Sequence, residues 1–287
     1  MAETFSAVEE FEFRNAPADD PGQRTDRAEL VTLISQTNVA SLIRKLEHAA
    51  LLSPEEKRAL ENACSSFRHL PPRTNLVSEG DPVQRVSIIL EGFACRYRLQ
   101  TDGRRQVVGL LLPGDMCDIC ACILKHMDHS IGTLSPVLAS QISREVADSL
   151  LDRYPRLARA FWWSTLVEES IAREWVVNVG HRTAFERMAH LFCEIFERLH
   201  TVGLTRGDTC DLPLTQAELS DALALSAVHV NRVLMEMRHN QLITLRNQQL
   251  TLHDYQALRN IAGFDARYLH LDGTNGPSFA AAQQRTA

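Results

Sequence analysis

The chain has 287 residues, which is long for a single hydrophobic core and favours two packed units with flanking tails. Its net charge of −6 argues against a protein that coats nucleic acid nonspecifically, because such proteins are usually basic. Seven cysteines at irregular spacing favour reduced thiols over a disulfide framework, and no apolar run approaches the ~18 residues of a membrane helix, so we expect a cytoplasmic protein without a membrane partner.

Both ends of the chain have the composition of tails. Residues 1–27 combine acidic residues, proline and glycine without a sustained hydrophobic period, which is typical of disorder, and residues 265–287 are predicted as a second flexible tail. Two modest helices follow the first tail, one near Val39–Ala50 and one that Ser53 and a following proline begin. The second of them is predicted to end near Ser66.

From residue 67 to residue 142 the chain consists of short apolar runs separated by turn residues. Four glycines lie 12, 11 and 11 residues apart, each beside an acidic or turn-forming residue: Gly80, Gly92, Gly103 and Gly114. Such spacing is typical of an antiparallel barrel or jelly roll, and we assign these glycines an architectural role. The strands between them are predicted at Val86–Leu90, Ala94–Leu99 and Gln106–Leu112.

Three cysteines lie close together within this region, at Cys117, Cys120 and Cys122, followed by His126 and His129. Thiols and imidazoles at this density could bind zinc or an iron–sulfur cluster, or form a redox switch. Structural zinc prefers paired CxxC modules, however, and the segment has one. Small buried hydrophobic residues are therefore the alternative interpretation.

Residues 155–179 are predicted to form one long helix. Four large apolar side chains fall on a near-heptad seam along it, at Leu157, Phe161, Ile171 and Trp175. Because this is more apolar surface than one neighbour can cover, we predict that a parallel partner helix covers the seam in a homodimer. Packing on the chain's own β-roll is the alternative. Gly180 is predicted to break the helix and to act as a hinge.

Residues 214–243 are predicted to form two short helices joined by a tight turn. Thr215 and Glu218 have the spacing of a capping box, and Ser226 can cap the second helix. In that helix the residues with helical spacing on the inward face are Val230, Val233, Leu234 and Met237. The opposite face carries Ala227, Val228, Asn231 and Arg232.

This outward face has the chemistry of a base-reading surface. Arginine can bond to the O6 and N7 of guanine, asparagine can address adenine, and a small apolar side chain can pack on a thymine methyl. A predicted hairpin from Ile243 to Leu252, with a polar link at residues 246–249, is the pattern of a wing. The segment therefore predicts a DNA-reading winged helix-turn-helix, with an ordinary helical hairpin as the alternative.

The run from Leu214 to Ile243 resembles the DNA-binding end of the cyclic-AMP receptor protein and fumarate-nitrate regulator (Crp/Fnr) family of bacterial transcription factors. In that family the helix that starts at the position of Ser226 enters the major groove, and the position of Arg232 commonly contacts guanine. Ala227 and Val228 depart from the Arg-Glu pair of well-known members, which puts the usual operator sequence in doubt. By their positions in the family, four residues are expected to contact DNA phosphates: Thr215, Gln216, Ser226 and His229.

The β-rich region resembles the cyclic-nucleotide-binding β-roll of the same family. The resemblance places an effector pocket at Gly114, Asp115, His129 and Ser130. Nucleotide-binding members carry Arg-Ser where this chain has His129-Ser130, and a usually neutral imidazole suits a phosphate less well than a guanidinium does. We therefore do not expect cyclic AMP as the effector, whose identity stays unknown. A cavity for another small ligand and a roll filled by side chains both remain open.

Redox-sensing members of the fumarate-nitrate type hold an iron–sulfur cluster with cysteines near the N-terminus. Residues 1–63 contain no cysteine, so that sensor is not expected. A metal- or thiol-based sensor that uses the cysteines at 117, 120 and 122 remains an alternative, as does an effector-independent regulator. The sequence shows no nucleophile with an adjacent base that would indicate an enzyme.

We therefore predict an α+β protein with an N-terminal cyclic-nucleotide-binding-type β-roll, a long dimerisation helix and a C-terminal winged helix-turn-helix. The predicted function is a homodimeric transcription regulator that binds two major-groove half-sites of double-stranded DNA about 34 Å apart. The resemblance also implies RNA polymerase as a partner. The predicted division is a tail at 1–27, a sensor domain at 28–154, the dimerisation helix and hinge at 155–180, the DNA-binding domain at 181–264 and a tail at 265–287.

Overall fold

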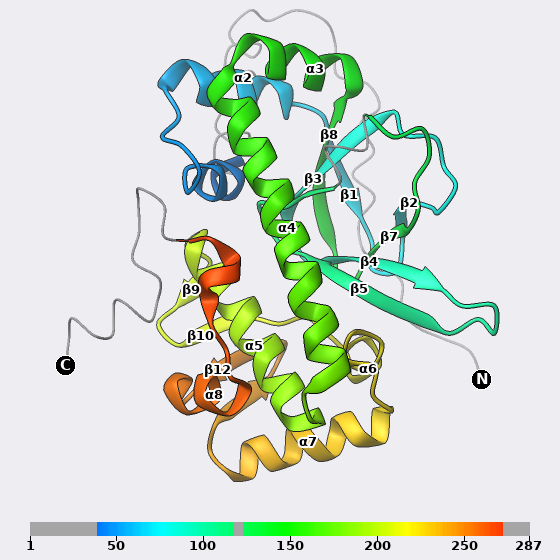
Figure 1. Ribbon diagram of the computed structural model, residues 1–287, viewed down its shortest axis with the longest axis vertical. Helices are drawn as coiled ribbons and strands as arrows, with labels where there is room; N and C mark the ends of the chain where they lie inside the picture. The colour runs from blue at the N-terminus through cyan, green and yellow to red at the C-terminus, as the bar shows by residue number, and fades with distance from the viewer. Residues whose placement is uncertain (1–38, 118–122, 272–287) are drawn as a thin grey trace, which may run out of the picture. The chain divides into compact units, whose positions relative to one another are not determined.

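Two four-stranded antiparallel sheets form the N-terminal half of the chain. They are seen in a computed structural model that describes residues 39–117 and 123–271 (Figure 1). One sheet has the strand order β1-β8-β3-β6, with bounds Phe67–Leu70, Val137–Ser143, Arg85–Glu91 and Met116–Cys117. The other has the order β2-β7-β4-β5, with bounds Asn75–Val77, Ser130–Thr133, Ala94–Leu99 and Arg105–Leu111. The predicted β-roll is confirmed, and its three predicted strands are β3, β4 and β5.

The turns of the roll lie where the glycine spacing places them. All four glycines have positive φ angles, as a left-handed turn residue requires. At Gly114 a Cβ atom would also lie 2.8 Å from the carbonyl oxygen of Ser41. A side chain at this position would therefore collide with the backbone of the preceding helix, which confirms the architectural role.

Helices flank the roll on its N-terminal and C-terminal sides. They comprise a helix at residues 39–46, α2 (Pro54–Ala63) and α3 (Arg144–Arg153). Ser53 caps α2 with the full capping box that its sequence suggests, and α2 ends at Ala63, short of the predicted Ser66. These helices and the first half of α4 (Pro155–His181) share one hydrophobic core with β3.

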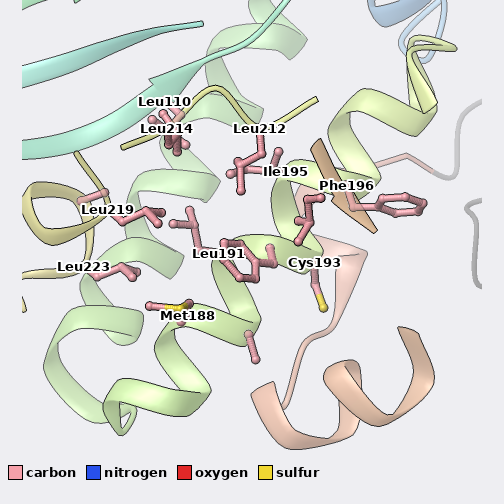
Figure 2. Packing of buried hydrophobic residues seen from close by; sticks show 14 of the residues in the cluster. Leu110, Met188, Leu191, Cys193, Ile195, Phe196, Leu212, Leu214, Leu219 and Leu223 are labelled. Atoms are coloured by element: carbon pink, nitrogen blue, oxygen red, sulfur yellow. The ribbon is translucent and has the colours of Figure 1, made fainter. Parts of the chain in front are cut away.

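A second core joins the roll to the C-terminal half of the chain. Its central element is α5 (Ala184–Thr201), in which Met188, Leu191 and Phe196 are almost fully buried. Figure 2 shows these side chains packed among Leu110 of β5 and the leucines of the helix-turn-helix. The prediction that Gly180 breaks the long helix is wrong by a small margin, because Gly180 lies in the last turn of α4 and the helix ends at His181.

The C-terminal part is a three-helix unit with a small sheet. The helices are α6 (Gln216–Leu223), α7 (Ala227–His239) and α8 (Tyr255–Ala262). The sheet has the order β11-β12-β10-β9, with bounds Ile243–Arg246, Gln249–Leu252, Thr209–Asp211 and Thr205–Arg206. Among the described helices, none is both long enough and apolar enough to cross a bilayer.

The predicted tail at 265–287 needs a correction at its start. A short 3-10 helix, η2 (Ala266–Leu269), follows α8, and Leu269 and Leu271 are buried. The Tyr268 hydroxyl also donates to the Glu194 carboxylate of α5 at 2.8 Å. Residues 265–271 therefore belong to the folded core because their apolar side chains cover α4 and α5. The predicted tail at 1–27 lies outside the described residues.

Candidate nucleic-acid interface

The helix-turn-helix begins with the predicted caps. The Thr215 hydroxyl accepts a hydrogen bond from the Glu218 amide at 3.2 Å, and the Glu218 carboxylate accepts one from the Thr215 amide at 2.7 Å. Ser226 caps α7 by accepting from the His229 amide at 3.2 Å. Between the helices Ala224 adopts the left-handed conformation, with a φ angle of 51°. Local capping therefore fixes both helix starts and the turn that separates them.

The two faces of α7 divide as the helical spacing predicts. Val230, Val233, Leu234 and Met237 are each at most 3% exposed and pack in the core shared with α5 and α6. The predicted base-reading residues Ala227, Val228, Asn231 and Arg232 are all exposed. The same exposed face continues for another turn with residues that the sequence reasoning missed, at Met235, Arg238 and His239. Their spacing of seven residues from Val228, Asn231 and Arg232 is the signal that could have found them.

Arg232 is held beside the N-terminus of α7. Its guanidinium donates to the Nε2 atom of His229 at 2.7 Å, one helical turn earlier. The four predicted phosphate contacts lie at the starts of α6 and α7: Thr215, Gln216, Ser226 and His229. The hydroxyls of Thr215 and Ser226 act as acceptors in the caps, and a hydroxyl hydrogen can be donated to a phosphate at the same time.

The predicted wing is a two-residue hairpin between β11 and β12. Residues Asn247 and Gln248 form its turn and have φ angles of 51° and 59°, as a type I′ turn requires. Arg246 is the last residue of β11 and is exposed. The wing therefore presents a guanidinium next to two polar side chains.

In the described part of the chain, the four residues predicted for an effector pocket are not seen to line a common cavity. Asp115 is buried in an ion-pair network, and the Ser130 hydroxyl accepts from the Glu79 amide at 2.9 Å. His129 has its Nδ1 atom 2.7 Å from the Asp128 carboxylate. Inside the roll the structure has a cavity of about 150 Å³, which is smaller than the ~300 Å³ at the lower end of typical ligand sites. None of the four predicted residues lines it; its walls include Leu76, Val83, Arg85, Cys117, Met127 and Gln141.

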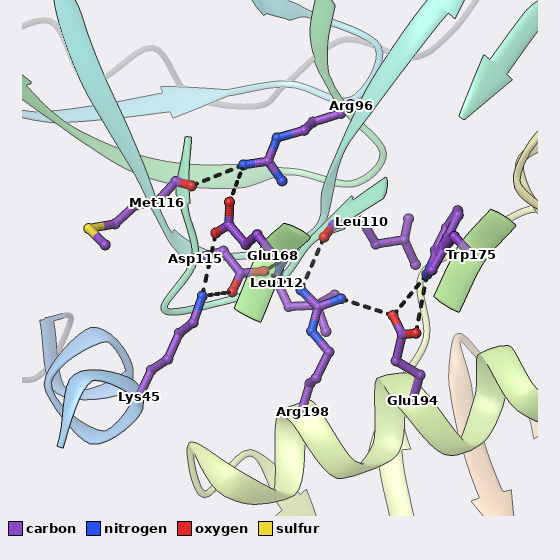
Figure 3. Close-up of polar contacts among 10 residues, drawn as sticks. All are labelled: Lys45, Arg96, Leu110, Leu112, Asp115, Met116, Glu168, Trp175, Glu194 and Arg198. Carbon is purple, nitrogen blue, oxygen red and sulfur yellow. Dashed lines mark hydrogen bonds and ion pairs between the residues drawn. The ribbon is translucent and has the colours of Figure 1, made fainter. Parts of the chain in front are cut away.

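Asp115 instead connects the β-roll to helices on either side of it (Figure 3). Its two carboxylate oxygens lie 2.7 Å from the Lys45 ammonium and 2.6 Å from the Arg198 guanidinium of α5. Lys45 also lies 3.6 Å from Glu168 of α4, which pairs with Arg96 of β4 at 2.8 Å. Charges from four separate elements therefore neutralise one another in a partly buried network.

A second carboxylate extends this network into α5. Glu194 is fully buried, and Arg198 lies 3.2 Å from it on the same helix. The indole of Trp175 donates to both Glu194 oxygens at 3.1 and 3.2 Å, and the Tyr268 hydroxyl donates to one of them. The pKa values of Asp115 and Glu194 shift in opposite directions. Burial alone would raise the pKa of Asp115, but Lys45 and Arg198 outweigh it and hold that pKa at about 2. Burial dominates at Glu194 and raises its pKa.

The helix-turn-helix also contacts the β-roll directly. Arg105 of β5 pairs with the Asp221 carboxylate of α6 at 2.8 Å, and the Gln106 side-chain amide donates to the Asp221 carbonyl at 2.8 Å. Both charged side chains keep about a third of their surface exposed. This contact joins the β4-β5 hairpin to α6, the helix that precedes α7.

The predicted dimer seam on α4 is wrong. Leu157 and Phe161 lie in the core with α2 and α3, and Ile171 and Trp175 lie in the core with α5, so that none is more than 8% exposed. These side chains were assigned to a partner because the sequence does not reveal how much of the helix the chain itself covers. The exposed stripe lies on the opposite face, with spacings of four, three, four, three and four, at Trp162, Leu166, Glu169, Arg173, Val176 and Gly180.

The cysteine cluster is described at one position. Cys117 is a buried thiol in β6, while Cys120 and Cys122 lie outside the described residues. Within residues 39–117 and 123–271, no group of three or more histidine, cysteine or acidic side chains could hold a metal ion.

Comparisons with known proteins match both halves of the chain. A model of the Crp-like helix-turn-helix domain matches residues 186–261, and a model of the cyclic nucleotide-binding domain matches residues 67–154. The chain is 28% identical over 228 residues to the transcriptional activator protein FnrL of Cereibacter sphaeroides, which covers 78% of this chain and 91% of FnrL. It is 28% identical over 194 residues to the nitrogen fixation regulation protein FixK of Bradyrhizobium diazoefficiens, which covers 66% of this chain and 81% of FixK. The solved structure of FixK2 from Bradyrhizobium japonicum shares the fold, with a TM-score of 0.62 at 22% identity over 70% of this chain and 98% of FixK2.

Proposed function

Since the chain belongs to the Crp/Fnr family of DNA-binding transcription regulators, we propose that it acts as a homodimer whose two α7 helices enter successive major-groove half-sites. The proposed division has a sensor domain at 28–154, a dimerisation helix at 155–181 and a DNA-binding domain from residue 182 to residue 271. RNA polymerase is the proposed partner at the promoter. The proposal does not include an enzymatic activity.

The observation that carries this proposal is the composition of the exposed face of α7. A solvated helix normally fills its outer face with long charged side chains, whereas this face has Ala227, Val228 and Asn231 beside Arg232. Arg232 can bond bidentately to guanine, and Asn231 can address adenine. Ser226 and His229 lie at the helix N-terminus, where the unpaired backbone amides favour phosphate. One docked helix can therefore contact both base edges and phosphates.

The exposed stripe on α4 supports the homodimer. Trp162, Leu166 and Val176 are 55%, 58% and 73% exposed although they are large and apolar. Glu169 and Arg173 lie between Leu166 and Val176 on the same stripe, and they form an ion pair at 3.2 Å within the helix. A parallel copy of the same stripe would bury the apolar residues, and the ion pair within each helix would offset the like charges that face each other across the seam. We propose this stripe as the dimer interface.

Two contacts favour control of DNA binding by the β-roll. The Arg105–Asp221 ion pair connects β5 to α6, and the Asp115–Arg198 ion pair connects the base of the roll to α5. A signal that shifts the roll relative to either helix would change the placement of α7. We propose that this signal is not cyclic AMP, because His129 stands at the phosphate-clamping position and the cavity is small.

The test is a selection of DNA sites with the purified chain, followed by affinity measurements for Arg232→Ala. We expect the variant to lose about 1 to 3 kcal/mol on the selected site and to relax the preference at one symmetric base pair. Arg153→Ala is the matched control, because its side chain is 70% exposed and lies on α3. An equal loss for Arg232→Ala on the selected site and on random DNA would contradict the proposed base contact.

A further inference from the structure

The exposed face of α7 carries an apolar pair that folding does not use. Val228 is 82% exposed, more than any other large apolar side chain in the described part of the chain, and Met235 is 61% exposed. The inward face of the helix is already complete, because Val230, Val233 and Met237 are almost fully buried. The pair therefore adds no packing within the chain and leaves apolar surface in contact with water.

The surroundings of this pair favour a negatively charged partner. Asn231 and Arg232 lie between Val228 and Met235 on the same face, and Arg238 and His239 follow on the next turn. The one acidic side chain of α7, Glu236, projects about 100° around the helix from Met235 and lies one turn after Arg232, so that the two arginines of the helix outnumber it. A protein partner with an apolar patch would gain little from such a cationic border. The major groove of DNA offers phosphates at its edges and one apolar group on its floor, the C5 methyl of thymine.

The spacing of the exposed residues on α7 would let them contact several successive base pairs. Val228, Asn231, Arg232 and Met235 stand at positions i, i+3, i+4 and i+7, the same spacing with which homeodomain recognition helices contact the major groove. Seven residues correspond to about 10 Å along the helix axis, or roughly three base-pair steps of 3.4 Å. Methionine is unbranched and polarisable, so that it can follow an irregular apolar contact.

We propose that Val228 and Met235 each pack on a thymine methyl, on either side of the base pair that Arg232 reads. The proposal rests on the proposed function and makes it more specific, because each half-site then contains two thymines about three base pairs apart that flank a guanine–cytosine pair. Both apolar side chains thereby contribute to the choice of sequence and not to general affinity for DNA.

Replacement of thymine by uracil tests the proposal, since it removes the methyl group and leaves the base pairing unchanged. In the selected site, each thymine is replaced in both half-sites at once, and affinity is measured with the full chain. Burial of one methyl corresponds to about 0.8 kcal/mol, a roughly fourfold change. We expect a loss of about 15-fold for each of two symmetric thymine pairs and little change at the others.

Two variants connect each methyl to its side chain. Met235→Ala should abolish the uracil effect at one pair of positions, and Val228→Ala should abolish it at the other. Both residues are exposed, so that neither variant should lower the melting temperature. Val146→Ala, at a 41% exposed position on α3, is the control and should keep both effects.

Three results would overturn this proposal while leaving DNA recognition intact. They are a selected half-site without thymine, a site on which no uracil replacement lowers affinity, and uracil effects that persist unchanged in both variants. The last result would indicate that other side chains contact the thymine methyls. Failure of the wild-type chain to select any DNA sequence would instead contradict the proposed function.

Discussion

Replacement of Leu166 by glutamate should separate the two subunits of the proposed dimer. Leu166 is 58% exposed in the first half of the α4 stripe, with Trp162 one turn before it and Glu169 one turn after it. Full burial of a leucine side chain contributes about 1.5 to 3 kcal/mol, so the part still exposed in one subunit contributes about 1 to 2 kcal/mol. Two subunits make this loss about 2 to 4 kcal/mol in the dimer.

The new carboxylate should add to this loss because it lies beside Glu169, at a site where the partner also presents two acids. The dimer Kd should therefore rise by at least about 30- to 800-fold. Sedimentation velocity over a range of concentrations measures this shift directly. The thermal stability of the monomer should stay close to that of the wild type, because more than half of the side chain is exposed in the single chain.

Leu51→Glu is the matched control for this variant. Leu51 is 54% exposed but lies outside α4, in the segment before α2, so that its replacement should leave the dimer intact. The reasoning is refuted if Leu166→Glu dimerises as tightly as Leu51→Glu. It is also refuted if the wild-type chain is monomeric at concentrations at which it binds its selected DNA site.

Two further predictions concern the buried charges of α5. Burial and the nearby Arg182 lower the pKa of His190 to about 3, so below pH 6.5 the unfolded chain takes up a proton that the folded chain does not. The free energy of unfolding should therefore fall as the pH falls from 6.5 towards 3, by about 2 kcal/mol at pH 5. In urea unfolding, the variant His190→Gln should lack this pH-dependent loss. Arg198→Met leaves Asp115 and Glu194 without their shared cation and should cost about 3 to 5 kcal/mol in urea unfolding. The further change Glu194→Gln should recover part of that cost; no recovery would contradict the assigned role of Glu194.

The features that the sequence predicts well are the ones whose causes are local. The capping box at Thr215 and the helix cap at Ser53 need partners three residues away, and the turn glycines need only their own φ angle. The two faces of α7 likewise follow from helical spacing within one segment. Because these signals require no knowledge of distant residues, the amino-acid sequence is enough to place the β-roll, the helix-turn-helix and the wing.

The features that the sequence misplaces depend on distant partners. Asp115 follows a turn glycine at a position where the family places an effector pocket, but its cationic partners stand 70 and 83 residues away in the chain. Nothing near Asp115 indicates that it is neutralised. The same limit applies to α4, which has two heptad stripes, one more apolar than the other. Sequence identifies the more apolar stripe as important, yet only the packing of α5 and α2 shows that the chain covers it itself.

The DNA-binding half is not basic, since residues 181–264 contain eight arginines and no lysine against nine acidic residues. Several of the arginines serve the interior: Arg187 donates to the Leu223 carbonyl at the end of α6, Arg182 pairs with Glu174, and Arg198 pairs with two acids. These three guanidinium groups are not available to neutralise phosphates, so the sequence-independent part of DNA binding should be modest. Base contacts made twice, once by each subunit, must then supply much of the affinity, which is why a dimer-breaking change and a base-reading change are both expected to weaken DNA binding.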